Sequence, residues 1–383
     1  MLLEIVRQKP EPNHRLELFR KALSSFIGLL CFLSLLQAQS VVKDQLSDWP
    51  VAKPESVGFS SARFDAIRAW LKAGPTTAMM VISHGHVIFS YGDVARPTKI
   101  ASVRKSILSM LMGKYVISGK IDMNKTVKEL GLDDRRPFIS PEERATLEQL
   151  LTARSAIFMD DRTDYLTQLQ PDRGTAYPGT YFYYNNWEFD AAGTAFEKLT
   201  GKNIYDALED DLAKPLGMQD FHRVLQKKIP SPGSIHPEYA MYLSTRDMAR
   251  LGLLMQHSGN WNGAQIIPSE WVRYSTSIIT RWSEMEPPLL REPGFPEHWG
   301  FGAGWWVWDA PVFPGSLNES PFQGAYEARG TGGQYITVIP SRDLVLIHKV
   351  DLGEKPDASI SQQEWDTITN MVIAAICSGP CTN

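Results

Sequence analysis

The chain has 383 residues, of which 43% are apolar, 21% charged and 10% aromatic, and its formal net charge is −4. This composition is typical of a globular protein with a large core, and it excludes a disordered or low-complexity chain. The net charge is slightly acidic and no basic stripe runs along the sequence, which argues against nucleic acid as a partner. The length fits one large domain or two lobes.

The N-terminal segment has the pattern of a secretory signal peptide. Basic residues between positions 15 and 21 precede a mostly apolar run at 26–36, and the small residue Ala38 follows it. We therefore expect residues 1–38 to be a signal peptide, residues 39–383 to form the mature protein, and the product to be secreted or periplasmic. The apolar run is shorter than the roughly 20 residues of a membrane span, so no stable span is expected after cleavage; an uncleaved anchor is the alternative.

Cleavage after Ala38 would leave two cysteines, Cys377 and Cys381, near the end of the chain. In a secreted protein this pair predicts a small disulfide loop, and free thiols are the alternative. No second Cys/His pair lies at partner spacing in the sequence, so we expect no metal site.

The first elements after the signal segment are a helix, a hairpin and a second helix. Residues 60–74 have the pattern of a capped amphipathic helix. Two β-rich runs, 78–83 and 87–91, flank His84-Gly85-His86 and predict a hairpin. We expect its two histidines to be turn residues rather than metal ligands. The next helix starts at Ser102 and is apolar nearly all round, so it should be buried.

Helical signals dominate from about residue 120 to 260. They include Ser140-Pro141-Glu142-Glu143, which has the pattern of a capping box, and a further helix start at Ser244. Strand signals return near the C-terminal end, and a last capped helix follows at Ser361. The strand runs are 304–308, 334–339 and 344–348. The Pro-rich segment 285–321 is expected to form long loops.

Strands at both ends of a helical middle predict an α+β fold. We expect an antiparallel sheet flanked by N- and C-terminal helices, with a mainly helical second lobe. The sheet lobe would comprise residues 50–115 and 295–383, and the helical lobe residues 116–290.

Candidate chemistry begins with Ser102-Val103-Arg104-Lys105, where the buried helix starts. Residues three apart share a helix face, with Cβ atoms about 5–6 Å apart, so the Lys105 amine can reach the Ser102 hydroxyl. Burial disfavours the charged form of a lysine, and a neutral amine can act as a base. A capping serine with a solvent-reaching lysine is the alternative, because Ser40-Val41-Val42-Lys43 shows that the tetrapeptide also arises by chance.

Several segments in order resemble the serine β-lactamase and penicillin-binding-protein superfamily, above all its class C-like esterases and 6-aminohexanoate-dimer hydrolases. The stretch from Ser102 to Lys105 is similar to the Ser-x-x-Lys motif, and Tyr184-Asn185-Asn186 is similar to the Tyr-x-Asn motif. The resemblance covers roughly residues 50–350. It implies a β-lactamase/transpeptidase-like fold and a reaction that needs no cofactor.

The resemblance also implies roles for single residues. Ser102 would be the nucleophile, with Lys105 and Tyr184 as acid and base. Asn186 would hydrogen-bond the lysine or a substrate carbonyl. The backbone amides of Ser102 and Thr331 would form the oxyanion hole, and Gly330 would let its strand approach the substrate closely.

The third motif departs from the family pattern. Ala328-Arg329-Gly330 stands where Lys-Thr-Gly, Lys-Ser-Gly or His-x-Gly is usual, so the cation for a substrate carboxylate is missing. Strand alternation would point Arg329 away from the cleft. Trp305 and Trp306 nearby would face opposite sides, so at least one belongs to the core.

We therefore expect a serine hydrolase that cleaves a small ester, amide or peptide through an acyl-enzyme, acting as an esterase or amidase. One alternative is a β-lactamase or a D-Ala-D-Ala carboxypeptidase-type enzyme that acts on β-lactams or cell-wall peptides. The other is a non-catalytic binding protein of the same fold.

Overall fold

The computed structural model describes residues 46, 48–159, 170–286, 298–309, 322–379 and 381. The chain divides into two compact units, Met1–Pro50 and Val51–Asn383. The described residues of the first unit form a turn, in which the Trp49 amide donates to the Leu46 carbonyl at 2.9 Å. The expected signal peptide, residues 1–38, lies outside the described residues. Among the described helices, none combines the length and apolarity that crossing a membrane requires.

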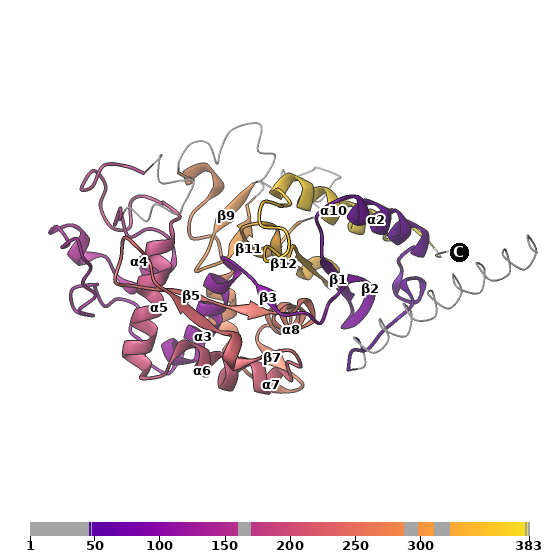
Figure 1. The fold of residues 1–383 in the computed structure, drawn as a ribbon, viewed down its shortest axis with the longest axis horizontal. Coiled ribbons are helices and arrows are strands. Elements are labelled where there is room, and N and C mark those ends of the chain that lie inside the picture. The colour runs from indigo at the N-terminus through magenta and orange to yellow at the C-terminus, as the bar shows by residue number, and fades with distance from the viewer. Residues whose placement is uncertain are drawn as a thin grey trace, which may run out of the picture. The chain divides into compact units, whose positions relative to one another are not determined.

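The second unit is built on a seven-stranded antiparallel sheet (Figure 1). Its strands, in spatial order, are β2 (His86–Gly92), β1 (Ala78–Ser83), β13 (Leu344–Lys349), β12 (Gln334–Ile339), β11 (Tyr326–Gly330), β10 (Trp306–Trp308) and β9 (Trp299–Phe301). Segments from both ends of the unit thus form one sheet, which confirms the predicted α+β architecture. The predicted hairpin is β1–β2, and His84 occupies its turn with φ 50°.

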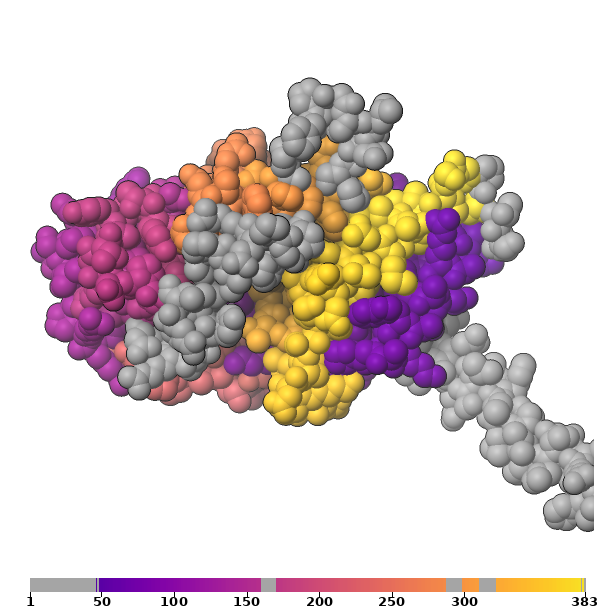
Figure 2. All heavy atoms as spheres, turned by 90° about the horizontal axis from the view of Figure 1, so that it is seen from above, coloured from indigo at the N-terminus to yellow at the C-terminus, as the bar shows by residue number. Residues whose placement is uncertain are grey.

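Two helices, α2 (Ser61–Ala73) and α10 (Gln362–Ala374), lie side by side over one face of the sheet (Figure 1, Figure 2). Their apolar stripes pack on alternate residues of the strands, as the two-residue period of a β-strand requires. The shared core includes Phe64, Ile67, Leu71, Trp365, Ile368 and Val372 from the helices, and Met79, Val81, Leu344 and Leu346 from the strands. The predicted capping box of α10 is present, between Ser361 and Glu364.

The opposite face carries α8 (Thr245–Gln256) and α3 (Val103–Ile117). Gly252 lets α8 approach the sheet, because a Cβ there would lie 2.5 Å from Cγ1 of Val345. Twelve of the fifteen residues of α3 are buried, which confirms the prediction of a buried helix after Ser102. Ser244 caps α8, as predicted.

The middle of the chain forms a lobe that is less purely helical than predicted. Three two-stranded ribbons interrupt it: two pair neighbouring segments, and the third pairs a strand just before Ser102 with one near the end of the lobe. The ribbons are β3 (Thr98–Lys99) with β6 (Tyr242–Leu243), β4 (Lys227–Ile229) with β5 (Glu238–Ala240), and β7 (Asn260–Trp261) with β8 (Ala264–Gln265). Its helices are α4 (Leu147–Leu151), α5 (Asn186–Thr200), α6 (Ile204–Leu208), α7 (Lys214–Leu216) and α9 (Ser269–Ser275).

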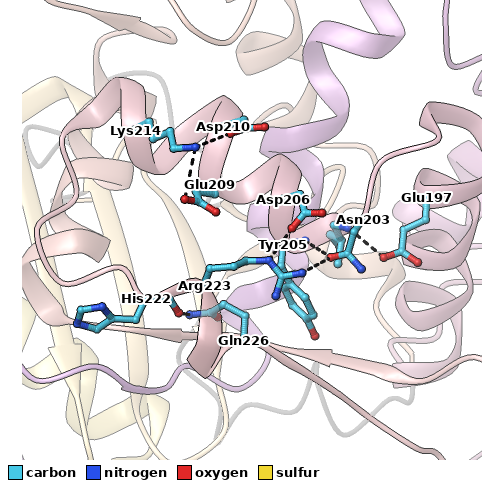
Figure 3. A network of polar contacts seen from close by, with 11 residues as sticks. Glu197, Asn203, Tyr205, Asp206, Glu209, Asp210, Lys214, His222, Arg223 and Gln226 are labelled. Atoms are coloured by element: carbon cyan, nitrogen blue, oxygen red, sulfur yellow. Dashed lines mark hydrogen bonds and ion pairs between the residues drawn. The ribbon is translucent and has the colours of Figure 1, made fainter.

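A polar network secures the corner between α5 and α6 (Figure 3). Asn203 caps α6 by accepting a hydrogen bond from the Tyr205 amide at 3.0 Å. Arg223 donates to both Asp206 and Asn203, at 2.6 and 3.1 Å. Glu197, at the end of α5, accepts from the Ile204 amide at 2.9 Å. The start of α6 is therefore fixed relative to α5, the helix that begins at Asn186, the last residue of the Tyr-x-Asn segment.

Two expectations for local structure were wrong in part. The predicted helix at Ser140 is only a 3-10 turn, Glu142–Arg144. Glu143, the N3 residue of that pattern, pairs with Lys128 at 2.8 Å instead of closing a capping box. The buried Glu142 carboxylate accepts from the Ile139 amide at 3.0 Å and from Arg173 Nε at 2.6 Å. In the segment expected to form long loops, residues 298–309 contain β9 and β10, while 287–297 and 310–321 lie outside the described residues.

The C-terminal cysteine pair is joined as predicted. Cys377 and Cys381 form a disulfide, with their Cα atoms 5.6 Å apart. In the part of the chain that the structure describes, no group of three or more His, Cys, Asp or Glu side chains is arranged to hold a metal ion.

Candidate active site

Ser102 lies in a tight turn between β3 and α3. The preceding residue, Ala101, has a φ of 47°, which is uncommon for a residue with a Cβ and is often found at functional sites. Ser102 is the N-cap residue of α3, but its side chain makes no capping hydrogen bond. The hydroxyl is therefore not committed to the helix, and the residue lines a cavity of about 320 Å³.

Lys105 lies one helical turn beyond Ser102 and is only 1% exposed. Its Nζ lies 3.9 Å from the ring centroid of Tyr184 and 4.8 Å from that of Phe189. Within the described ranges Nζ has no hydrogen-bond partner. A buried amine without a hydrogen bond is costly, and here the faces of two aromatic rings are its nearest described partners.

Tyr184 lies just before α5, where its ring packs in an aromatic cluster. Its ring centroid is 5.5 Å from that of Phe189, 5.7 Å from that of Phe301 and 5.4 Å from that of Trp306. Trp306 is thus the tryptophan beside the predicted site. Trp305 is fully buried in the core and contacts Tyr326.

Asn186 is the first residue of α5 and lines the same cavity as Ser102. The preceding Asn185 caps the helix by accepting from the Glu188 amide at 3.0 Å, which fixes where α5 starts. Because Lys105 Nζ has no hydrogen-bond partner among the described residues, the expected bond from Asn186 to the lysine is not formed here. The substrate carbonyl is the other expected partner for Asn186.

The end of β11 passes directly beside the serine turn. A Cβ on Gly330 would lie 2.5 Å from the Ile100 carbonyl oxygen and 3.2 Å from the Ser102 amide nitrogen. Thr331 follows and lines the cavity. Within the described ranges, the amides of Ser102 and Thr331 donate no backbone hydrogen bond. Two free amides at the edge of a cavity are what an oxyanion hole requires.

Arg329 points away from this cavity, as strand alternation predicts. Its Nε donates to Glu327 at 2.8 Å, and its guanidinium lies over the rings of Trp299 and Trp306, 4.7 and 4.8 Å from their centroids. It therefore does not replace the missing cation of the third motif.

Of the predicted site residues, Ser102, Asn186 and Thr331 thus line one cavity, whereas Lys105, Tyr184 and Gly330 are not part of its wall. The charged residues of this wall were not identified from the sequence; they are Lys99, Arg104, Asp190 and Glu238. Arg104 lies inside the Ser-x-x-Lys motif, and Asp190 lies four residues after Asn186, on the same face of α5. That helical spacing was a usable signal for Asp190.

Glu188 is a further buried acid near the site. Its carboxylate accepts hydrogen bonds from the amide and the hydroxyl of Ser155. Burial raises its pKa to about 8, against the opposing effects of Ser155 and of the Lys105 charge. We found no signal for it in the sequence, because a glutamate in the first turn of a helix usually faces solvent or caps the helix.

The close approach at Gly330 predicts a steric effect on the site. Gly330→Ala should displace either β11 or the Ser102 turn, because its Cβ would lie 2.5 Å from the Ile100 carbonyl oxygen and 3.0 Å from Cβ of Gln334. We expect kcat/KM for an ester to fall about 100-fold, in the range for a lost oxyanion-hole donor. Gly379→Ala, which meets no atom within 4 Å, is the matched control. Parental kinetics in Gly330→Ala would show that the amides beside Gly330 do not hold the oxyanion.

The buried carboxyl of Glu188 predicts a pH-dependent stability. Its pKa is about 8 in the folded protein against a usual value of 4.5, so the folded state holds a proton that the unfolded chain releases. This contribution is complete below about pH 4.5 and is lost as the pH rises through about 8. Glu188→Gln should therefore gain stability relative to the parent between pH 5 and 8.5, by on the order of 3 kcal/mol.

Urea unfolding at both pH values measures this difference. The exposed Glu270→Gln is the control and should show no pH-dependent difference. If the free energy of unfolding of Glu188→Gln differs from that of the parent by the same amount at both pH values, the Glu188 carboxyl is ionised in the folded protein.

Comparison with known proteins shows the family and the fold. The sequence model of the Beta-lactamase family matches residues 65–352. An uncharacterized protein of Alkalihalophilus pseudofirmus is 24% identical over 277 residues, which cover 67% of this chain and 74% of that protein. The D-alanyl-D-alanine-carboxypeptidase/endopeptidase AmpH of Escherichia coli is 24% identical over 221 residues, 51% of this chain and 55% of AmpH.

Solved structures share the fold. A putative 6-aminohexanoate-dimer hydrolase from Bacillus anthracis superposes with a TM-score of 0.59 at 20% identity, over 86% of this chain and 87% of that one. EstCE1, a hydrolase with promiscuous acyltransferase activity, superposes with a TM-score of 0.58 at 14% identity, over 82% and 98%. With its family match, its fold and the ordered motifs at one cavity, the chain belongs to the β-lactamase family of serine hydrolases.

Proposed function

We propose that this protein hydrolyses a small ester or amide through a covalent acyl-enzyme on Ser102. The observation that carries the proposal is the placement of Lys105, a buried amine without a hydrogen-bond partner in the described ranges, one turn from a serine on a strained turn. The amine makes no hydrogen bond to Ser102 Oγ in the described structure, so the proposal is that the two meet when substrate binds. A serine one helical turn from an amine, at the edge of a cavity with free amides, is an arrangement that suits acyl transfer.

In the first half of the reaction, Ser102 Oγ attacks the substrate carbonyl carbon. Its proton passes to Lys105, with Tyr184 sharing the transfer. The amides of Ser102 and Thr331 stabilise the negative oxygen of the tetrahedral intermediate. When that intermediate collapses, the bond to the leaving group breaks, and the leaving alcohol or amine takes the proton.

In the second half, water attacks the ester that Ser102 has formed with the acyl group. The same two side chains accept the proton of this water and return it to Ser102 Oγ. The products are the free acid and the unchanged enzyme, so no oxidant or cofactor takes part.

An ester or amide without a carboxylate is favoured over a β-lactam that carries one, because Arg329, the nearby cation, faces away from the cavity and is bound to Glu327. The chain also has no Lys-Ser-Gly or Lys-Thr-Gly to hold a substrate carboxylate. A cell-wall peptide is the second candidate, which the similarity to AmpH supports.

We also propose that the protein is exported. The basic and apolar pattern of residues 1–38 supports a signal peptide. The disulfide between Cys377 and Cys381 fits an oxidising compartment.

A substrate panel tests the proposal. Purified protein should hydrolyse p-nitrophenyl acetate and butyrate with a kcat/KM at least about 100-fold above that for nitrocefin or a D-Ala-D-Ala peptide. Without a cation for their carboxylate, the latter two should lose about two or more kcal/mol of transition-state stabilisation. A preference for nitrocefin or the peptide would favour the second candidate. Binding without turnover of any of these compounds would favour the non-catalytic alternative.

A further inference from the structure

The cavity beside Ser102 has cations in its wall, although the third motif supplies none. Lys99 lies on β3, three residues before Ser102, and Arg104 lies on α3, two residues after it. Either could in principle bind the carboxylate of a substrate. Whether they do so depends on what already holds them.

Both cations are paired with carboxylates that line the same cavity. Lys99 Nζ lies 3.0 Å from Oε1 and 3.2 Å from Oε2 of Glu238. One guanidinium nitrogen of Arg104 lies 2.8 Å from Oδ1 of Asp190, and its Nε lies 3.7 Å from Glu238. Two positive and two negative side chains thus line the cavity, and their formal charges cancel.

The two ion pairs differ in accessibility. The Arg104 side chain is 3% exposed and lies over the ring of Tyr239, 4.4 Å from its centroid. Burial opposes its charge, but Asp190, followed by Tyr239 and Glu238, outweighs that effect and raises the pKa of Arg104. This pair is a fixed part of the wall. Lys99 and Glu238 are 35% and 26% exposed, so an entering substrate meets this pair first.

A carboxylate that enters this cavity would lose its hydration without gaining a free cation. It would also approach Glu238, a like charge that a protein interior screens poorly. A site can select its substrate by such a repulsive group as effectively as by an attractive one. A neutral acyl group has no charge to desolvate and is not repelled by Glu238.

Building on the proposed function, we propose that the cavity takes acyl donors that carry no free carboxylate, and that Glu238 enforces this choice by neutralising Lys99. Glu238 is then a specificity-determining residue. It lies on β5, and the paired β4 leads into residues Ile229 to Pro232 of the cavity wall. The ribbon β4–β5 is therefore the element that determines whether the cavity accepts a neutral or a charged acyl group.

The test uses a matched pair of esters, p-nitrophenyl butyrate and mono-p-nitrophenyl succinate, which differ in a terminal carboxylate. The measured quantity is the ratio of their kcat/KM values, neutral over charged. We expect a ratio of at least 10 for the parent and a fall of at least tenfold in Glu238→Gln, whatever its overall activity. The double variant Lys99→Met/Glu238→Gln should restore a high ratio, because the released cation is gone.

Glu143→Gln, which removes the carboxylate of an exposed ion pair with Lys128 outside the cavity wall, is the control and should keep the parental ratio. A parental ratio near 1, or an unchanged ratio in Glu238→Gln, would overturn the inference. These outcomes are distinct from failure of the proposed function, in which neither ester would acylate Ser102.

Discussion

Ser102→Ala is expected to lower kcat/KM for p-nitrophenyl butyrate by about 10⁴ or more, the scale of loss when a hydrolase loses its covalent nucleophile. The removed hydroxyl makes no capping hydrogen bond to α3, so the fold should be unaffected. Thermal unfolding of the variant should therefore match that of the parent within about 2 °C, equivalent to about 1 kcal/mol for a domain of this size.

Ser109→Ala is the matched control for this change. Ser109 lies on the same helix and is buried, and its hydroxyl has no hydrogen-bond partner among the described residues. Its loss should leave kcat/KM within about twofold, because the removed hydroxyl makes no hydrogen bond among the described residues and plays no part in the proposed reaction. Parental hydrolysis by Ser102→Ala would remove this serine from the mechanism.

Lys105→Met is expected to lower kcat/KM by about 10³, within the range for loss of a general base. Methionine has nearly the same length and fills the space between the rings of Tyr184 and Phe189. The parent buries an amine without a hydrogen-bond partner in the described ranges, so its replacement by an apolar group should not lower the free energy of unfolding. Activity should fall while stability stays equal or rises.

Urea unfolding and ester kinetics on the same preparation measure both quantities. Lys114→Met is the control on the same helix: Lys114 is partly exposed and pairs with Asp211, so its loss should leave the kinetics near parental. A Lys105→Met variant that keeps more than about a tenth of parental activity would assign the base to another group. A variant that loses stability in proportion to activity would make Lys105 a structural residue.

The elements with strong periodic or capping patterns were predicted well from the sequence. α3, α8 and α10 begin where their sequence signals place them, and the β1–β2 hairpin forms around His84. The helix predicted at Ser140 does not form. The carboxylate that its capping box would have used belongs to Glu143, which instead pairs with Lys128, 15 residues earlier, and the local pattern could not show this partner.

The site was only partly predictable. The order of the motifs singled out Ser102, Tyr184 and Gly330 as candidate site residues. Strand alternation predicted that the Arg329 side chain points away from the cavity. The charge of the cavity could not be predicted, because Glu238 lies on a ribbon 139 residues after Lys99 in the sequence. Glu188 was missed for a similar reason, since its partner Ser155 lies in a separate loop.

The most direct test of the central claim is the mass of the reacted protein. The parent, mixed with p-nitrophenyl butyrate and quenched in acid within milliseconds, should gain one butyryl group on the peptide that contains Ser102. The adduct should disappear as turnover ends and should be absent from Ser102→Ala. Steady ester hydrolysis with no adduct on Ser102, or with an adduct on another residue, would contradict the account.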